Sequence, residues 1–135
     1  MNTIYIKENV SDLEIELQQI GAKYKFSPSI LRAEKIENKN RVHMEHIDGE
    51  CLANIYGDDP SNIPKWIWND IRKIVEILYT EEGIEYIDIT GYNFIEKDGR
   101  IYIIDFGDAK YTDGNINWFL REFLDGENSW NPDYK

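Results

Sequence analysis

Two aspartates stand in a part of the chain that is otherwise built of apolar, β-favouring residues. Asp88 and Asp105 each follow a short apolar run within YIDITGYNFIEKDGRIYIIDFGDAKY, which covers residues 86–111. The segment KDGR, residues 97–100, predicts a tight turn between two strands. Buried strands are rigid supports, so we expect the two carboxylates to project from strand ends. The alternative is that both cap turns, where Asp is common.

The spacing of the oxygen-bearing side chains suits transfer of a phosphoryl group. That reaction depends on positioned metal ions, screened phosphate charge and an oriented acceptor. Asp105 at a strand end can reach a Mg²⁺ ion that bridges the phosphates, and Asn93 offers an amide oxygen to a second ion. Asp88, five residues before Asn93, can accept a hydrogen bond from an attacking hydroxyl. For Asn93, too, a turn-forming role is the alternative.

Hydrophobic patterning predicts an α+β chain in the order β-α-β-β-α-β-β-α. Ser11 and Glu14 form a capping box at the start of the first helix, and Asp125-Gly126 would close the last one. The expected strands are 3–7, 29–37, 41–47, 93–97 and 100–105, and the expected helices are 11–22, 64–80 and 115–124.

Three segments, in order along the chain, resemble the protein-kinase superfamily. The family's catalytic loop, H-R-D-L-x-x-x-N, is similar to YIDITGYN, which gives Asp88 and Asn93 the family's separation. The D-F-G triplet is present at residues 105–107, twelve residues after Asn93. MEHIDGECL, at residues 44–52, is similar to the kinase hinge. The resemblance covers about residues 7–107.

The resemblance implies a minimal protein-kinase-like fold. It implies a small antiparallel sheet with one helix, and a truncated helical lobe that carries the catalytic-loop hairpin. We expect one kinase-like domain of residues 1–135, with a reduced N-lobe at 1–47 and a truncated C-lobe at 48–135. Asp88 would be the catalytic residue, and the Mg²⁺ ligands would be those assigned above.

The same resemblance implies a binding site for ATP. Lys7 in IYIK resembles the lysine of V-A-I-K, which holds the α- and β-phosphates. Its usual partner is a helix glutamate, and Glu14 in EIELQ stands at the matching place. Glu16 is the alternative, because Glu14 also belongs to the capping box. The contacts to adenine would come from the backbone of the hinge residues Met44, Glu45, His46 and Ile47.

Four departures from the family pattern affect these assignments. Only six residues precede Lys7, so we expect the glycine-rich loop over the phosphates to be missing and nucleotide affinity to suffer. Ile87 replaces the H-R-D arginine, so control by a phosphorylated activation loop is not expected. Thr90 replaces a lysine that steadies the γ-phosphate. The 28 residues after Gly107 contain no A-P-E and leave no room for a peptide-binding lobe. Such reduced kinase-like proteins suggest a viral or phage source.

Composition disfavours several classes of function. The net charge of −11, with no Lys/Arg cluster longer than a pair, disfavours nucleic acid and anionic membranes as partners. His43 and His46 lack the spacing of zinc ligands. Cys51 is the single cysteine, so no disulfide forms within the chain. Without a signal-peptide-like N-terminus or a membrane-length apolar run, we expect an intracellular protein.

Two classes of function remain open from the sequence. One is a minimal ATP- and Mg²⁺-dependent phosphotransferase that acts on a protein or small-molecule hydroxyl, because the lysine, both aspartates and the asparagine are present. The other is a pseudokinase or kinase mimic that acts by binding a protein partner, because the glycine-rich loop and substrate lobe are missing. The aromatic side chains considered for such a contact are Trp66 and Trp118, whose expected main role is core packing, and Trp130 and Tyr134.

Overall fold

The computed structural model describes residues 3–125, which have the α+β architecture that the sequence predicted. The strands are β1 (Ile4–Val10), β2 (Ile30–Ile36), β3 (Lys39–Glu45), β4 (Ile84–Glu85), β5 (Phe94–Lys97), β6 (Arg100–Ile103) and β7 (Lys110–Tyr111). The helices are α1 (Asp12–Lys23), α2 (Leu52–Tyr56), α3 (Lys65–Glu82) and α4 (Trp118–Asp125), and single 3₁₀ turns lie at η1 (Pro60–Asn62) and η2 (Gly91–Asn93).

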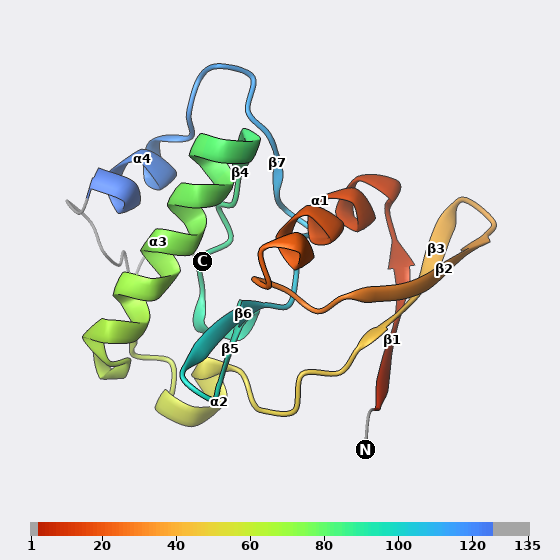
Figure 1. The fold of residues 1–135 in the computed structure, drawn as a ribbon. Helices are drawn as coiled ribbons and strands as arrows, with labels where there is room; N and C mark the ends of the chain where they lie inside the picture. The colour runs from red at the N-terminus through yellow and green to blue at the C-terminus, as the bar shows by residue number, and fades with distance from the viewer. Residues whose placement is uncertain (1–2, 126–135) are drawn as a thin grey trace.

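Residues 3–47, called the sheet lobe here, form an antiparallel sheet in the order β1-β3-β2 with α1 on one face (Figure 1). On that face, Ile15 of α1 packs against a small cluster of buried residues, Val10, Val42 and Met44. The β-branched and apolar residues of the strands account for the sheet, because they pack well on a pleated surface. Since β3 is central, β1 has an edge that no described strand covers.

The start of α1 forms half of the predicted capping box. The hydroxyl of Ser11 accepts a hydrogen bond from the backbone N–H of Glu14 at 3.1 Å, which satisfies one free donor of the first turn. The carboxylate of Glu14 does not return the bond and is directed to Lys7 instead. The helix therefore starts where the pattern predicted, while one member of the box has a different partner.

Residues 50–125, called the helical lobe here, are built around α3 (Figure 1). The helix buries one face at helical spacing, as its sequence predicted: Ile67, Ile71, Ile74, Val75 and Leu78. Gly83 ends it with φ 66°, a left-handed conformation that glycine adopts without steric cost.

The hairpin that carries the candidate site is formed by β5 and β6. The strands pair antiparallel from Phe94↔Ile103 to Lys97↔Arg100, so the predicted hairpin is present, with β6 ending two residues before Asp105. The turn residues between them, 98 and 99, both have positive φ, as the tight turns of two-residue hairpins require.

Helix α1 also belongs to the core of the helical lobe. Leu17 is fully buried in the same apolar cluster as Ile71 and Phe106. A Cβ atom on Gly21 would lie 2.9 Å from the ring of Phe106, so only glycine allows this close approach. The helix therefore connects the sheet of one lobe to the D-F-G segment of the other.

Several short elements were not predicted from the sequence. Helix α2 has five residues, and β4 and β7 form a two-stranded ladder of only two residue pairs. Such short pieces carry too few residues to show a period. Helix α4 begins three residues later than predicted, and the predicted stop at Gly126 lies outside the described residues.

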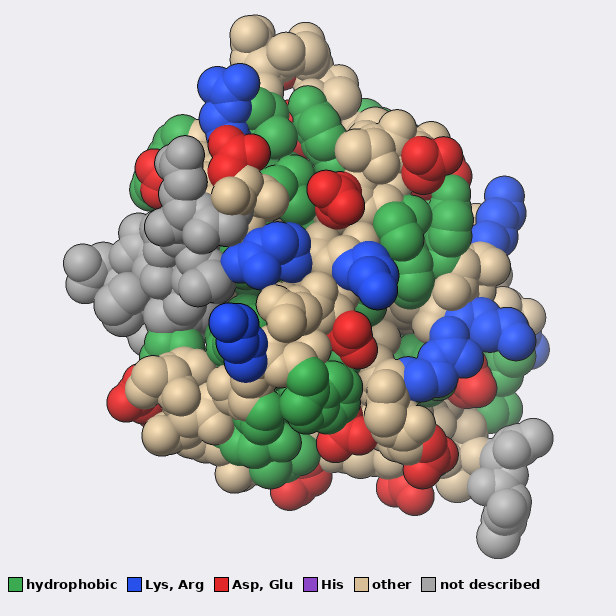
Figure 2. Space-filling model, turned by 60° about the vertical axis from the view of Figure 1, so that its left-hand side comes forward, with side chains coloured by type: hydrophobic (Ala, Val, Ile, Leu, Met, Phe, Trp, Pro, Cys, Tyr) green, Lys and Arg blue, Asp and Glu red, His purple; other side chains and the backbone are tan. Residues whose placement is uncertain are grey.

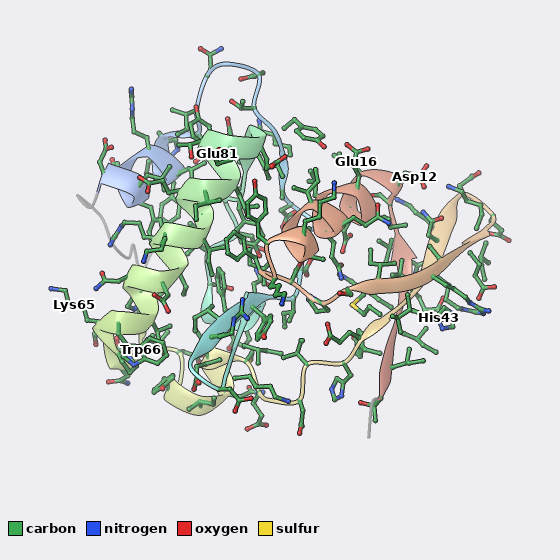
Figure 3. The ribbon with its side chains drawn as sticks, viewed as in Figure 1. Asp12, Glu16, His43, Lys65, Trp66 and Glu81 are labelled. Carbon is green, nitrogen blue, oxygen red and sulfur yellow. The ribbon has the colours of Figure 1, made fainter. Side chains whose placement is uncertain are left out.

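The prediction of core packing for two tryptophans is wrong. Trp66, in the first turn of α3 (Figure 3), is 45% exposed, and Trp118 at the start of α4 is 59% exposed. Their neighbours Ile67 and Phe119 fill the interior positions instead, because a helix turns only one face to the core. Trp130 and Tyr134 lie outside the described residues.

The surface offers no single-sign patch on the face drawn in Figure 2, where Lys and Arg side chains lie among acidic ones. Between residues 3 and 125, no helix is both long enough and apolar enough to cross a membrane.

Candidate active site

Lys7 lies at the junction of the two lobes and contacts two carboxylates. Its Nζ donates to Oε2 of Glu14 at 2.6 Å and to Oδ1 of Asp105 at 3.4 Å. Burial alone would lower the pKa of Lys7, but the hydrogen bonds and charges of Glu14 and Asp105 raise it above its usual value. The ammonium group therefore stays charged and is held beside Asp105.

The structure separates the two candidate glutamates of α1. Glu14, with a side chain only 10% exposed, pairs with Lys7. Glu16 accepts a hydrogen bond from the hydroxyl of Tyr111 in β7. The open choice in the sequence is thus decided in favour of Glu14.

Asp105 is fixed by hydrogen bonds on both its backbone and its side chain. The backbone N–H of Gly107 donates to Oδ1 of Asp105 at 2.7 Å, and the hydroxyl of Tyr86 donates to the Asp105 carbonyl oxygen at 2.6 Å. Burial raises the pKa of Tyr86 well above its usual value, so the phenol keeps the proton that it donates. Phe106 is buried edge-on against Tyr86, with ring centroids 5.6 Å apart. This packing aims the Asp105 side chain at the junction of the lobes.

Asp88 and Asn93 lie at the two ends of a compact loop. The loop is closed by Thr90 N–H to Asp88 O at 3.1 Å, Asn93 N–H to Thr90 O at 3.1 Å and Asn93 Nδ2 to Asp88 O at 2.8 Å. The nitrogen of the Asn93 amide therefore serves the turn, as the alternative interpretation held. No hydrogen bond within residues 3–125 uses its side-chain oxygen, which belongs to a buried residue that lines a cavity.

The electrostatic surroundings of Asp88 make it a better proton acceptor. Burial raises its pKa most, the hydrogen bond from the Asn93 amide lowers it, and the nearby carboxylates of Asp108 and Asp105 raise it. The net direction is upward. Sequence reasoning missed Asp108, although its position directly after D-F-G was a signal that it would lie near the site.

A cavity of about 290 Å³ brings most of the predicted binding residues together. It lies between the sheet lobe and the β5–β6 hairpin, with apolar walls from Ile95 and Ile104. The predicted residues that line it are Lys7, Met44, Glu45, His46, Ile47, Asn93 and Asp105. The other two predicted residues do not line the cavity. Glu14 accepts a hydrogen bond from Lys7, and the backbone carbonyl of Asp88 accepts one from Asn93.

The backbone N–H groups at the end of β3 and just after it differ in their hydrogen bonds. The N–H groups of Glu45 and His46 donate to Ser29 O at 2.9 Å and Thr3 O at 3.2 Å. Among residues 3–125, the N–H of Ile47 donates to no acceptor, although Ile47 is only 7% exposed. A buried, unpaired N–H is costly unless a ligand or water accepts its proton. Ile47 lines the cavity, so this donor is available to an acceptor atom of a ligand.

Two tyrosines of the cavity were not predicted. Tyr5 stands two residues before Lys7 on the same face of β1, and its ring stacks on His46 with centroids 6.5 Å apart. Tyr92 precedes Asn93 and donates its hydroxyl to Asp58 at 2.6 Å. The period of two along β1 could have indicated Tyr5.

The oxygen atoms available to a metal are few. Within residues 3–125, no group of three or more His, Cys, Asp or Glu side chains is arranged to hold an ion. Mg²⁺ bound together with phosphates needs only one or two protein oxygens. Asn93 and Asp105, which line one cavity, fit that requirement, and their shared metal stays a prediction.

Two known proteins are similar to this chain, one in sequence and one in fold. No family model matches the sequence. The KEOPS complex subunit Bud32 from Pyrococcus abyssi (strain GE5 / Orsay) is 31% identical over 80 residues, which are 58% of this chain and 36% of that relative. The match thus spans little more than a third of the relative's length. The structure of the kinase PK-1 from Cydia pomonella granulovirus is similar with a TM-score of 0.66 over 85% of this chain and 46% of that one. Its 11% identity supports the fold alone.

Proposed function

We propose that this chain, which belongs to the protein-kinase-like superfamily, binds ATP with Mg²⁺ and transfers the γ-phosphoryl group to a hydroxyl acceptor. One observation carries the proposal: Lys7, Asn93 and Asp105 line the same cavity as Ile47, whose N–H has no acceptor among residues 3–125. A base could use a backbone donor, the phosphates a cation, and a metal ion the oxygens of Asn93 and Asp105.

The base would lie at the Ile47 end of the cavity. Its acceptor nitrogen would take the N–H of Ile47, and its faces would pack on the apolar walls formed by Met44, Ile95 and Ile104. The phosphates would then extend toward Lys7, whose ammonium group Glu14 and Asp105 keep charged and in place. The apolar side chains would thus contact the base, and the cationic Lys7 would contact the anionic phosphates.

Asn93 and Asp105 would hold Mg²⁺. A bound ion would supply positive charge that screens the phosphates. Asn93 has its amide nitrogen bound to the Asp88 carbonyl, which leaves the oxygen for a ligand. Asp105 has one carboxylate oxygen bound to Gly107 and Lys7, which leaves the other.

Asp88 would accept the proton of the acceptor hydroxyl. As the hydroxyl oxygen forms its bond to the γ-phosphorus, the bond from that phosphorus to the β–γ bridging oxygen breaks, and the proton passes to the carboxylate of Asp88. The upward shift of the Asp88 pKa favours this role, because a base accepts a proton more readily as its pKa approaches the working pH.

The acceptor is a hydroxyl of a protein or a small molecule. The relative Bud32 is, by its name, a subunit of a complex, and we propose that this chain also acts with a protein partner. Thr90 supplies no positive charge at the place where many kinases have a lysine that steadies the γ-phosphate. A partner that brings basic side chains to the junction of the lobes would compensate for this.

Thermal unfolding with and without ATP tests the binding step. ATP with Mg²⁺ should raise the melting temperature, ATP with excess chelator should raise it much less, and AMP with Mg²⁺ should have little effect. Transfer of labelled γ-phosphate to the chain itself or to a co-purified partner then tests catalysis. No response to millimolar ATP and Mg²⁺, with the chain alone and with its partner, would reject the proposal.

A kinase mimic that acts by binding is the second candidate. The observation that favours it is the open edge of β1, where Ile4 and Ile6 are 56% and 48% exposed. A partner strand could pair with that edge. For this candidate, the partner binds equally well to wild type and to Lys7→Met, and no phosphate is transferred in either case.

A further inference from the structure

Helix α1 sets the position of Lys7, so whatever holds α1 also controls the candidate site. Glu14 is the direct link, because it bonds to Lys7 at 2.6 Å from the first turn of the helix. If α1 moved outward by one hydrogen-bond length, Lys7 would lose its nearest anion. The contacts between α1 and the helical lobe therefore bear on nucleotide binding.

Two tyrosine–carboxylate hydrogen bonds connect α1 to the helical lobe. Glu16, on the second turn, accepts from the hydroxyl of Tyr111 in β7. Tyr24, the C-cap residue, donates to Glu82 at the end of α3 at 2.5 Å. In Figure 3, Glu16 projects from the upper side of α1, away from the sheet, while Figure 1 shows β7 running beside the helix. Both bonds join elements that are distant in sequence.

Tyr111 is itself firmly placed. It pairs with Ile84 in the β4–β7 ladder, and the next residue, Thr112, donates to the fully buried carboxylate of Glu85 at 2.7 Å. The hydrogen bond to Glu16, together with burial and the charges of Glu16 and Glu82, raises the pKa of Tyr111 to about 12. The phenol is therefore protonated at neutral pH and able to donate.

The sequence lacks the usual means of holding this segment. A kinase that is controlled by phosphorylation uses the arginine before the catalytic aspartate, and Ile87 occupies that place. Tyr111 lies four residues after Gly107, in the segment that such an arginine would organise. A neutral phenol bound to Glu16 joins this segment to α1 without any phosphate.

We propose that Tyr111 and Glu16 are positioning residues: their hydrogen bond holds α1 against the segment after D-F-G and so keeps Glu14 on Lys7. The inference rests on the proposed function for its effect on ATP, but its effect on Lys7 exists without nucleotide. This hydrogen bond keeps the Lys7–Glu14 pair in place without phosphorylation of the chain. Tyr111 touches neither ATP nor acceptor and acts through α1.

The test compares Tyr111→Phe with the matched variant Tyr24→Phe. Each variant removes one tyrosine hydroxyl that connects α1 to the helical lobe. Tyr24 lies ten residues beyond Glu14, so the loss of its hydroxyl should not affect Glu14. In the nucleotide-free protein, acetic anhydride labelling of Lys7, read by mass spectrometry against the exposed Lys39, should rise about threefold or more in Tyr111→Phe. It should stay near the wild-type rate in Tyr24→Phe. Equal changes in both variants, or none, would overturn the inference.

Variants of Glu16 distinguish positioning from general loss of stability. Glu16→Ala should match Tyr111→Phe, whereas Glu16→Gln, which keeps an oxygen acceptor, should restore most of the protection of Lys7. The double variant Tyr111→Phe with Glu16→Ala should label no faster than the faster single variant, because both remove one interaction. Additive effects would contradict the assignment.

The ATP measurement separates the two proposals. Tyr111→Phe should weaken ATP–Mg²⁺ binding about three- to tenfold with a smaller change in turnover. If wild type fails to bind ATP but the labelling pattern holds, the proposed function fails and the positioning role stands. If wild type binds ATP while Lys7 labelling in Tyr111→Phe stays at the wild-type rate, the positioning role fails and the proposed function stands.

Discussion

Replacing each of the two aspartates by asparagine should separate metal binding from catalysis. Asp105→Asn and Asp88→Asn both keep the shape of the side chain and remove its charge. If Asp105 is a metal ligand, its charge contributes to nucleotide binding before any reaction. If Asp88 acts on the acceptor hydroxyl, its charge matters only as that proton is transferred. We therefore expect Asp105→Asn to abolish stabilisation by ATP–Mg²⁺ and Asp88→Asn to leave it almost intact.

The structure indicates that Asp105→Asn is a mild change in the nucleotide-free protein. The Lys7–Asp105 pair is 3.4 Å long, with side chains 26% and 44% exposed. Screening by water limits such a pair to at most about 1 kcal/mol. The amide oxygen of asparagine can still accept the hydrogen bond from Gly107. The melting temperature of the variant without ATP should therefore fall by no more than about 4 °C.

The rise in melting temperature that ATP causes in the wild type should be larger than the fall that the substitution causes. At a nucleotide concentration ten times the dissociation constant, binding stabilises the folded state by about 1.4 kcal/mol. For a chain of this length, that corresponds to a rise of roughly 6 °C. Loss of a ligating charge that weakens affinity about 100-fold would reduce the rise to below about 1 °C. Asp88→Asn should keep the full rise and lower turnover by about 10²–10⁴-fold.

Differential scanning fluorimetry at about 5 mM ATP with Mg²⁺ measures the first effect, and single-turnover phosphate transfer measures the second. The nucleotide-free melting temperature of each variant is the control. An unchanged rise in Asp105→Asn would refute its role as a metal ligand. An equal loss in both variants would refute the division of roles between the two aspartates.

Three further substitutions give expected outcomes of their own. Asp108→Asn removes a carboxylate that raises the pKa of Asp88, so the acid limb of the pH–rate profile should move to lower pH; an unmoved limb would contradict this. Gly21→Ala gains about 1 kcal/mol of helix propensity but crowds the ring of Phe106, which costs about 1–3 kcal/mol, so chemical denaturation should show a net loss. Lys7→Met should abolish the rise with ATP and also destabilise the protein, because it leaves a buried carboxylate unpaired; an unchanged melting temperature without ATP would argue against that pairing.

The sequence by itself determined the parts of the protein that depend on neighbours along the chain. The apolar stripe of α3, the β5–β6 hairpin with its turn at residues 98 and 99, and the cap at Ser11 all appear as predicted. The five-residue separation of Asp88 and Asn93 is also local, and the loop between them is closed by its own hydrogen bonds. Periodicity and turn chemistry act over a few residues, so a single sequence shows them.

Local reasoning failed where an element was too short or had two possible faces. Helix α2 and the β4–β7 ladder contain too few residues for a period. Trp66 and Trp118 are apolar, but each is placed on the outer side of its helix by neighbours that fill the core. An apolar residue in a helix is a candidate for burial, and only packing decides which candidates are buried.

Only the tertiary structure decided how the candidate site is assembled. Glu14 and Glu16 stand two residues apart on α1, and the sequence could not choose between them as the partner of Lys7. The choice follows from what surrounds the helix: β1 brings Lys7 to one side, and β7, which pairs with β4 in the helical lobe, brings Tyr111 to the other. Likewise, Asp108 affects Asp88 only because the chain folds the D-F-G segment back onto the loop that carries Asp88. Charges interact through space, and their distances are set by the packing of whole elements rather than by position in the sequence.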